Sequence, residues 1–276
     1  MEIITDRAGA LKQVKNYGRK LQYLSNEYKD NKDIVLAAVQ NDGWSLEYAS
    51  VRLKDDKEIV MAAVQNDSYA LQFASDRLKN DKEIVIIAIK NDGYALEFAS
   101  ERFKDNPEIV MAAVNRTGYA LQYVSDRLKA DKDVVMAAVQ QNGKSLHFAS
   151  DRFQDDKNIV MLAVQNNGYA LEDVSRRLKD DREIVMAAVQ NAGYVLLYAS
   201  KRLRDDREVV LAALENDGWS LYFASDRLRD DKIIIMSAMK TWSGALRCAS
   251  DRLQHDPELE LIAKGEKQNQ KIISFF

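Results

Sequence analysis

Residues 34–58 read IVLAAVQNDGWSLEYASVRLKDDKE, and residues 59–83 read IVMAAVQNDSYALQFASDRLKNDKE. The two segments align without a gap, and the same 25-residue register continues through nine copies. Working backward, residues 9–33 fit as a divergent first copy, and a half copy follows at 259–276. A fixed period of this length is typical of solenoids, in which small units stack to bury a shared core. Columns 1 to 25 are numbered from Ile34.

A first helix is predicted to begin directly after column 23, which holds Asp or Asn in all ten copies. Both residues are favoured N-caps, and column 24 is Pro107 or Pro257 in two copies, as suits the first helical position. The helix includes the apolar columns 1, 2, 3, 5 and 6 and ends at column 10, where glycine in eight copies suits a left-handed terminal residue. Expected starts fall just after Asp56, Asp81, Asp131, Asp181 and Asp231.

A second helix is predicted from column 11 to column 21. Leucine at column 13, a small or branched apolar residue at column 16, serine at column 17 and Leu, Phe or Tyr at column 20 lie at helical offsets on one face. The serines, such as Ser100, Ser125 and Ser175, are expected to be buried and to bond the carbonyl of the preceding turn. The sequence therefore predicts an all-α solenoid of stacked helical hairpins.

The repeats predict one α-solenoid domain over residues 1–276. Within it, residues 9–33 form a divergent N-terminal cap repeat, residues 34–258 form nine regular repeats, and residues 259–276 form a C-terminal cap helix. Terminal repeats of solenoids need such a polar outer face, because no neighbour covers them.

Composition narrows the class of protein. A formal net charge of -3 argues against nucleic-acid binding, because such proteins usually carry a strongly basic face. The single cysteine, Cys248, excludes an intrachain disulfide and fits a reducing compartment. No secretory signal is visible, and no apolar stretch approaches the roughly 20 residues that span a bilayer. A cytoplasmic protein without a membrane span is expected.

The recurring core A-V-x-x-x-G-x-x-L-x-x-A-S resembles a family of short helical repeats catalogued only as a domain of unknown function. Such repeats occur in bacterial, protist and giant-virus proteins, including effectors of bacteria that live inside host cells. The resemblance implies a helical array and supplies no reaction, ligand or cofactor. It also admits delivery into a host cell by a bacterium.

Catalytic and metal-binding signatures are absent from the sequence. His147 and His255 lie more than four copies apart, and no Cys/His spacing typical of a zinc site occurs. The glycines recur as helix ends and form no phosphate-binding loop. Ten serines at column 17 recur without a histidine partner. No catalytic residue, metal site or cofactor is predicted, and the chain is expected not to be an enzyme.

Three columns admit both a structural and a binding interpretation. Arginine fills column 19 in nine copies. It either pairs with column 23, four residues on, or with the next copy, or it tracks a phosphate backbone. Columns 11 and 15, mostly aromatic, either form the seam between copies or stack bases and line a peptide groove. If they form the seam, Lys144 at column 11 and Asp173 at column 15 of the next copy are predicted to be an ion pair.

Columns 14 and 18 are predicted to form the free face of the second helix, because their chemistry varies most between copies. Columns 4 and 7 form a second exposed stripe, mostly Ala with Gln. The favoured function is a non-enzymatic scaffold for a protein or peptide partner; the alternative is an anion or nucleic-acid binder. The candidate partner-binding residues lie toward the C-terminal half: Leu197, Tyr222, Arg247, Arg176 and Lys201.

Overall fold

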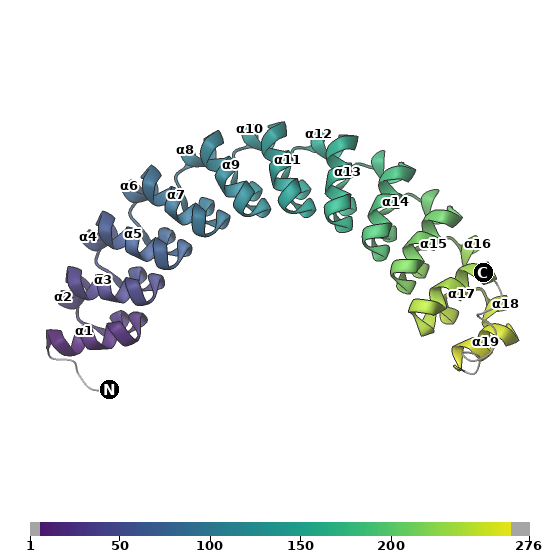
Figure 1. Ribbon diagram of the computed structural model, residues 1–276, viewed down its shortest axis with the longest axis horizontal. Helices are drawn as coiled ribbons and strands as arrows, with labels where there is room; N and C mark the ends of the chain where they lie inside the picture. The colour runs from purple at the N-terminus through teal and green to yellow at the C-terminus, as the bar shows by residue number, and fades with distance from the viewer. Residues whose placement is uncertain (1–5, 266–276) are drawn as a thin grey trace. The chain divides into compact units, whose positions relative to one another are not determined.

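The computed structural model describes residues 6–265, which form α-helices and 3-10 helices and contain no strand. The all-α repeat fold is confirmed. The chain divides into two units, residues 1–141 and 142–276, with the boundary between helices α11 and η6. Each unit is described by itself, and the single solenoid domain over 1–276 stays a prediction. In Figure 1 the same group of helices recurs in chain order within each unit.

The first arm of each regular copy is a ten-residue α-helix that begins at column 24. The cap is as predicted: Asp56 Oδ1 accepts hydrogen bonds from the backbone N–H groups of Glu58 and Ile59, at 3.0 and 3.3 Å. All five predicted starts are confirmed. The long helices are α1 (Arg7–Asn16), α3 (Lys32–Asn41), α5 (Lys57–Asn66), α7 (Lys82–Asn91), α9 (Pro107–Arg116) and α11 (Lys132–Gln141) in the first unit, and α13 (Lys157–Asn166), α14 (Arg182–Asn191), α15 (Arg207–Asn216) and α17 (Lys232–Thr241) in the second.

The prediction of a continuous second helix is wrong. Columns 10 to 15 form a 3-10 helix, columns 16 and 17 are extended, and a separate short helical segment follows. In the copy 59–83, Ala74 and Ser75 have φ of -66° and -62° with ψ of 158° and 157°, values that neither an α-helix nor a 3-10 helix contains. The offsets that suggested one helical face therefore come from two segments.

The 3-10 helices are η1 (Gly18–Tyr23), η2 (Gly43–Tyr48), η3 (Ser68–Phe73), η4 (Gly93–Phe98) and η5 (Gly118–Tyr123) in the first unit, and η6 (Gly143–Phe148), η7 (Gly168–Asp173), η9 (Gly193–Tyr198), η11 (Gly218–Phe223) and η12 (Ser243–Cys248) in the second. The short segments are α2 (Asn26–Lys29), α4 (Val51–Lys54), α6 (Asp76–Lys79), α8 (Glu101–Lys104), α10 (Asp126–Lys129), α12 (Asp151–Gln154), η8 (Leu178–Asp180), η10 (Leu203–Asp205), α16 (Asp226–Arg229) and α18 (Asp251–Gln254). In the first unit, the short α4, α6 and α8 follow one edge of the stack in Figure 1, with α5, α7 and α9 beside them.

The column 17 serines are half-buried, so the prediction that Ser100, Ser125 and Ser175 are buried is wrong. They also do not bond the preceding turn. The Ser125 and Ser175 hydroxyls donate to carboxylates of the preceding copy, Asp105 and Asp155. Each of these hydroxyls also accepts the N–H three residues on, as an N-cap does. The cap alone does not account for the break at column 17, because the backbone is extended in the same way at Ser100, which makes no side-chain cap bond. The Ser100 backbone N–H donates to the Lys79 carbonyl of the preceding copy at 3.1 Å.

The column 10 glycines are not left-handed, so the prediction that each ends the first helix as a left-handed residue is wrong. Within residues 6–265 the only positive φ belongs to Gly265. A Cβ on Gly43 would stand 2.5 Å from the carbonyl oxygen of Ala63 in the next copy, so glycine serves close packing between copies. The Gly43 N–H donates to Asn66 Oδ1 at 2.7 Å, which satisfies a buried donor across the same interface.

The seam predicted for columns 11 and 15 is confirmed. Trp44 meets Phe73 of the next copy edge-on with ring centroids 5.4 Å apart, and Tyr194 meets Phe223 in the same way at 5.0 Å. Such edge-to-face pairs are favoured because the positive rim of one ring faces the negative face of the other. The core beside the seam consists of columns 1, 2, 5, 6, 13 and 20, whose side chains are almost entirely buried.

One seam of the second unit is ionic. Lys144 Nζ lies 3.0 Å from Asp173 Oδ2 and 2.9 Å from Glu172 Oε2, and His147 Nδ1 lies 2.7 Å from Asp173 Oδ1. Burial alone lowers the pKa of Lys144, but hydrogen bonds to Glu172 and Asp173 raise it overall. The predicted ion pair is confirmed. A lone charge at this position would be costly, and the matched pair removes that cost.

Charged side chains at columns 23 to 25 also link consecutive copies. Lys57 Nζ, for example, lies 2.9 Å from Asp81 and 2.8 Å from Glu83 of the next copy. The half copy begins with α19 (Pro257–Ala263), capped by Asp256. Residues 266–276 of the predicted C-terminal cap helix lie outside the described residues.

Candidate partner-binding surface

Three of the five predicted binding residues lie together. Leu197, Tyr222 and Arg247 belong to η9, η11 and η12, which pack against one another in that order. Arg247 and Tyr222 are exposed, and Leu197 is half-buried. Arg176 and Lys201 are also exposed, but they follow the extended break, at the start of the next segment. The prediction that columns 14 and 18 share one helical face is therefore wrong.

Tyr222 belongs to a cluster of three aromatic rings, formed with Trp219 and Trp242 and called here the aromatic cluster. The two indole rings stack with centroids 4.4 Å apart and planes 24° from parallel. Tyr222 lies 5.6 Å from Trp219 and 5.5 Å from Trp242, measured between centroids. Trp219 is 48% exposed and Tyr222 is 51% exposed, so water reaches about half of each side chain.

The cluster exists because the copy 234–258 departs from the repeat. Column 9, where the other eight regular copies place small or polar residues, is Trp242 in this copy, and column 11 is Gly244. A Cβ on Gly244 would stand 2.8 Å from Trp242 Cε2, so the indole occupies the space that a column 11 side chain needs. Column 15 of this copy is Cys248, so Trp219 faces no aromatic ring there.

The edge of the cluster carries hydrogen-bonding groups. A hydrogen bond with the buried Cys248 thiol raises the pKa of Tyr222, while the positive charge of Arg247 acts in the opposite direction. The Tyr222 hydroxyl is the donor toward this thiol, because a hydrogen bond raises the pKa of a phenol when the neutral form donates it. Arg247 is exposed, and no ion pair of its guanidinium occurs among residues 6–265.

The arginine column joins consecutive copies. Arg77 Nε lies 3.0 Å from Asp55 Oδ1, and a second guanidinium N–H donates to the Asp55 backbone carbonyl at 2.6 Å. The partner is thus column 22 of the preceding copy, so both predicted partners, column 23 and the next copy, are wrong. Hydrogen bonds from Ser75 and Arg77 hold the pKa of Asp55 below its usual value. The same two arginine contacts recur at Arg52, Arg127, Arg177, Arg202, Arg227 and Arg252.

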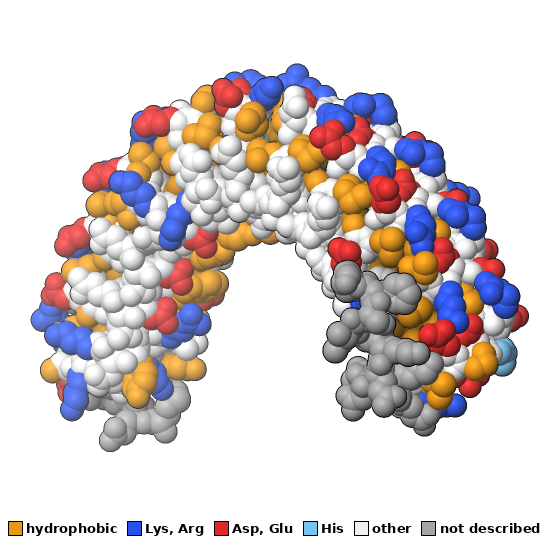
Figure 2. All heavy atoms as spheres, turned by 45° about the vertical axis from the view of Figure 1, so that its right-hand side comes forward, with side chains coloured by type: hydrophobic (Ala, Val, Ile, Leu, Met, Phe, Trp, Pro, Cys, Tyr) orange, Lys and Arg blue, Asp and Glu red, His pale blue; other side chains and the backbone are white. Residues whose placement is uncertain are grey.

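Basic and acidic side chains are consequently interspersed on the surface. Figure 2 brings the second unit forward and shows blue and red side chains beside one another along its edge, with orange apolar groups between them. Phosphate backbones are usually bound by surfaces of a single sign. The pairing of the arginine column therefore favours its structural interpretation.

The remaining chemistry-bearing groups are dispersed. His147 contacts Asp173, whereas His255 Nδ1 lies 2.8 Å from the Asp251 carbonyl. In the part of the chain that the structure describes, no three His, Cys, Asp or Glu side chains are arranged to hold a metal ion.

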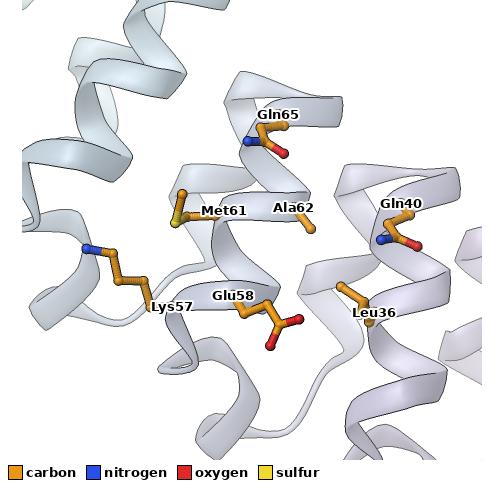
Figure 3. A pocket seen from close by; sticks show the side chains of 7 residues that line it. All are labelled: Leu36, Gln40, Lys57, Glu58, Met61, Ala62 and Gln65. Atoms are coloured by element: carbon orange, nitrogen blue, oxygen red, sulfur yellow. The ribbon is translucent and has the colours of Figure 1, made fainter.

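The exposed stripe of the first helices forms a second candidate surface. Between α3 and α5 a hollow of about 500 Å³ is open to solvent (Figure 3). Its lining consists of Leu36, Gln40, Lys57, Glu58, Met61, Ala62 and Gln65. Lys57 and Glu58 are already paired with neighbouring copies. Because similar Met, Ala and Gln residues recur along the chain, this stripe offers little to distinguish one partner from another.

Sequence reasoning missed Trp219 as a surface residue, because column 11 was assigned to the seam, and it missed Trp242, because column 9 was assigned no role. The signal that finds them is the shift of an aromatic residue from column 11 to column 9 in the copy 234–258, together with Cys248 at column 15. A seam residue is enclosed only when the following copy supplies its partner.

Comparison with protein families gives one match. A family model described as a domain of unknown function (DUF4116) matches residues 10–54, 56–104, 106–154, 156–204 and 206–254. Each matched segment spans about two of the 25-residue copies. Searches of curated proteins and of solved structures found no significant match. Among residues 6–265, no helix is long and apolar enough to cross a membrane.

Proposed function

The chain belongs to the family described as a domain of unknown function (DUF4116), and we propose that it is a non-enzymatic scaffold that binds a protein or peptide partner. The binding surface is the aromatic cluster with Leu197 and Arg247 beside it. The observation that carries the proposal is the contact of three aromatic rings, of which Trp219 and Tyr222 on η11 are about half exposed and Trp242 stacks on Trp219.

Exposed aromatic and arginine side chains supply much of the binding energy of protein interfaces, because they bury a large area and lose little conformational freedom. At column 14, Tyr222 and Leu197 stand where most copies place Gln, Glu or His. At column 14, Leu197 and Tyr222 replace polar residues in two consecutive copies of the second unit. A local apolar surface of this kind supports a binding role better than random surface variation does.

The absence of catalysis is part of the same proposal. Column 17 serines such as Ser75 and Ser225 are engaged in capping and in bonds to aspartates, without a histidine that could take their proton. The rival anion-binding function has weaker support, because the arginine column is already paired with acids.

The test begins with a displayed peptide library selected on the full chain. The affinity of the selected peptides is then measured for the parent chain and for Tyr222→Gln, which installs a residue that other copies carry at column 14. We expect Tyr222→Gln to weaken binding by about tenfold or more, the usual effect of removing an aromatic anchor. Gln122→Ala, in the same column of the first unit, is the matched control and should leave the affinity unchanged.

Two outcomes would contradict the proposal. In the first, the library yields no binding peptide; in the second, selected peptides bind Tyr222→Gln as tightly as the parent chain. Nucleic-acid binding with a steep dependence on salt concentration would instead favour the arginine-column alternative.

A further inference from the structure

We propose that the aromatic cluster binds a proline-rich segment in the polyproline II conformation, flanked by acidic residues. This inference rests on the function proposed above and names the chemistry of the partner. It is built from three features of the second unit: the exposed ring faces, the spacing of consecutive copies, and the charge at the edge of the cluster.

The ring faces suit proline. The cluster presents two indoles and a phenol whose planes lie within 32° of one another, and Trp219 and Tyr222 are about half exposed. Proline rings pack flat against aromatic faces, and aromatic-lined surfaces are the usual docking sites of proline-rich peptides.

The spacing of the copies suits polyproline II. Leu197, the aromatic cluster and Arg247 come from three consecutive copies whose 3-10 helices η9, η11 and η12 pack side by side. Packed helices lie about 8–10 Å apart. A polyproline II helix advances about 9 Å in each turn of three residues, so every third residue of such a ligand meets the next copy. Two steps between copies correspond to about six ligand residues.

Hydrogen-bond donors and charge complete the match. A polyproline II segment makes no internal hydrogen bonds, so its carbonyl groups need external donors. Trp44 Nε1 is engaged with Asp67, whereas no carboxylate stands at column 9 opposite Trp219, since that position is Trp242. The Trp219 indole N–H can therefore donate to a ligand carbonyl, whereas the Tyr222 hydroxyl, whose proton is directed to Cys248, can accept from a ligand N–H. Arg247 adds a positive charge beside Tyr222, which favours an acidic neighbour of the prolines.

The experiment uses a Trp44→Phe variant, in which the two remaining tryptophans of the chain both belong to the cluster. Its fluorescence is titrated with a peptide of about eight prolines flanked by aspartates, long enough to span the three copies. The comparison peptides are a glycine–serine peptide with the same aspartates and an oligoproline flanked by lysines. We expect saturable binding that is strongest for the aspartate-flanked oligoproline.

Two substitutions test what the aromatic ring and the charge each contribute to peptide binding. Tyr222→Gln should weaken oligoproline binding by about tenfold or more. Arg247→Gln should remove the preference for aspartate over lysine flanks while leaving the preference for proline over glycine and serine. The urea midpoint of each variant, compared with that of Trp44→Phe, separates a lost contact from a loss of folding.

The inference is overturned if the aspartate-flanked oligoproline binds no more tightly than the glycine–serine peptide. It is also overturned if Tyr222→Gln, folded as the parent chain is, binds oligoproline equally well. Library-selected peptides that still require Tyr222 would then leave the proposed function standing without proline specificity. If neither oligoproline nor any selected peptide requires Tyr222, both proposals fail.

Discussion

Residues 41–46 and 216–221 carry the same six residues, NDGWSL, yet their tryptophans have different surroundings. Trp44 is half-buried: its Nε1 donates to Asp67 at 2.8 Å, and its ring meets Phe73 edge-on. Trp219 is 48% exposed and stacks on Trp242. The two hexapeptides both begin a 3-10 helix in the same way, so local structure does not explain the difference.

The difference lies in the copy that follows. The copy 59–83 offers Asp67 at column 9 and Phe73 at column 15, which together enclose Trp44. The copy 234–258 offers Trp242 and Cys248 at the same columns. Trp44 is thus held in the seam by two groups of the next copy, and Trp219 has neither. Ring contact alone does not enclose a column 11 side chain, since Tyr194 meets Phe223 and is still 40% exposed.

Replacing Trp44 by alanine should cause the largest loss in the free energy of unfolding, and replacing Trp219 should cause a smaller one. Trp44→Ala removes an edge-to-face contact, an indole hydrogen bond and the packing of Arg19 over the ring, so we expect a loss of about 3 kcal/mol in the free energy of unfolding. Trp219→Ala removes stacking contacts that are half-exposed and should cost about 1 kcal/mol. Urea denaturation measures both values. Equal losses would show that the following copy does not set the environment of column 11.

The column 9 aspartates extend the comparison. Asp67 accepts from Tyr69 N and from Trp44 Nε1, both at 2.8 Å, so Asp67→Ala should cost about 2 kcal/mol. Asp217 caps its own 3-10 helix through Trp219 N at 2.9 Å, but the preceding copy has Tyr194, which carries no indole N–H. Asp217→Ala should therefore cost about 1 kcal/mol. Urea denaturation measures the loss in the free energy of unfolding for both variants. A larger loss for Asp217→Ala than for Asp67→Ala would contradict the claim that only Asp67 also bonds a tryptophan of the preceding copy.

Lys144 and Asp173 show that columns 11 and 15 need complementary side chains, which can be oppositely charged instead of aromatic. A double-mutant cycle of Lys144→Ala and Asp173→Ala should give a coupling free energy of about 1 kcal/mol, as expected for charged groups in direct contact and partly shielded from water. The single variants alone do not isolate this value, because Lys144 also contacts Glu172. Additive effects would mean that columns 11 and 15 do not meet at this seam.

The copies around Asp55 and around Asp205 should lose stability in acid to the same extent. Bonds from the serine and arginine of the next copy hold the pKa values of Asp55 and Asp205 below their usual range. A lowered pKa in the folded state contributes stability above the unfolded value of about 3.9, and that contribution is lost as the pH falls through the folded value. Ser75→Ala and Ser225→Ala should each reduce the loss of thermal stability below about pH 4, and to the same extent. Different slopes in the two variants would show that these bonds differ between units.

The starts of the long helices could be predicted from sequence because their signals are local. Asp56 and Asp181 cap helices through N–H groups two and three residues away, and such contacts need no knowledge of the neighbouring copy. The break at Ser75 could not be predicted in this way. Its backbone N–H donates to the Lys54 carbonyl of the preceding copy at 2.9 Å, and its side chain bonds Asp55 there. Helical offsets also fitted two separate segments, so periodicity alone was ambiguous.

Some residues of the candidate site could be predicted from the sequence, and others could not, for the same reason. Tyr222 and Arg247 could be identified because their column varies in chemistry between copies, and both are exposed. Trp219 could not, because its column is enclosed in the first unit and its exposure depends on Trp242 in the next copy. Contacts between copies are long-range in the sequence, and they decide which members of a column remain available for binding.

The most direct test gives Trp219 the same following copy that Trp44 has. The variant combines Trp44→Phe, Trp242→Asp, Gly244→Tyr and Cys248→Phe, which leaves Trp219 as the sole tryptophan. The references are a chain in which Trp44 is the sole tryptophan, through Trp219→Phe and Trp242→Phe, and a chain in which Trp44→Phe and Trp242→Phe leave Trp219 beside an otherwise unchanged copy. Acrylamide quenching of the fluorescence measures the accessibility of each indole. We predict that the exchanged copy lowers the quenching of Trp219 to the level of Trp44; quenching that stays at the level of the unchanged copy would contradict the claim that the following copy decides.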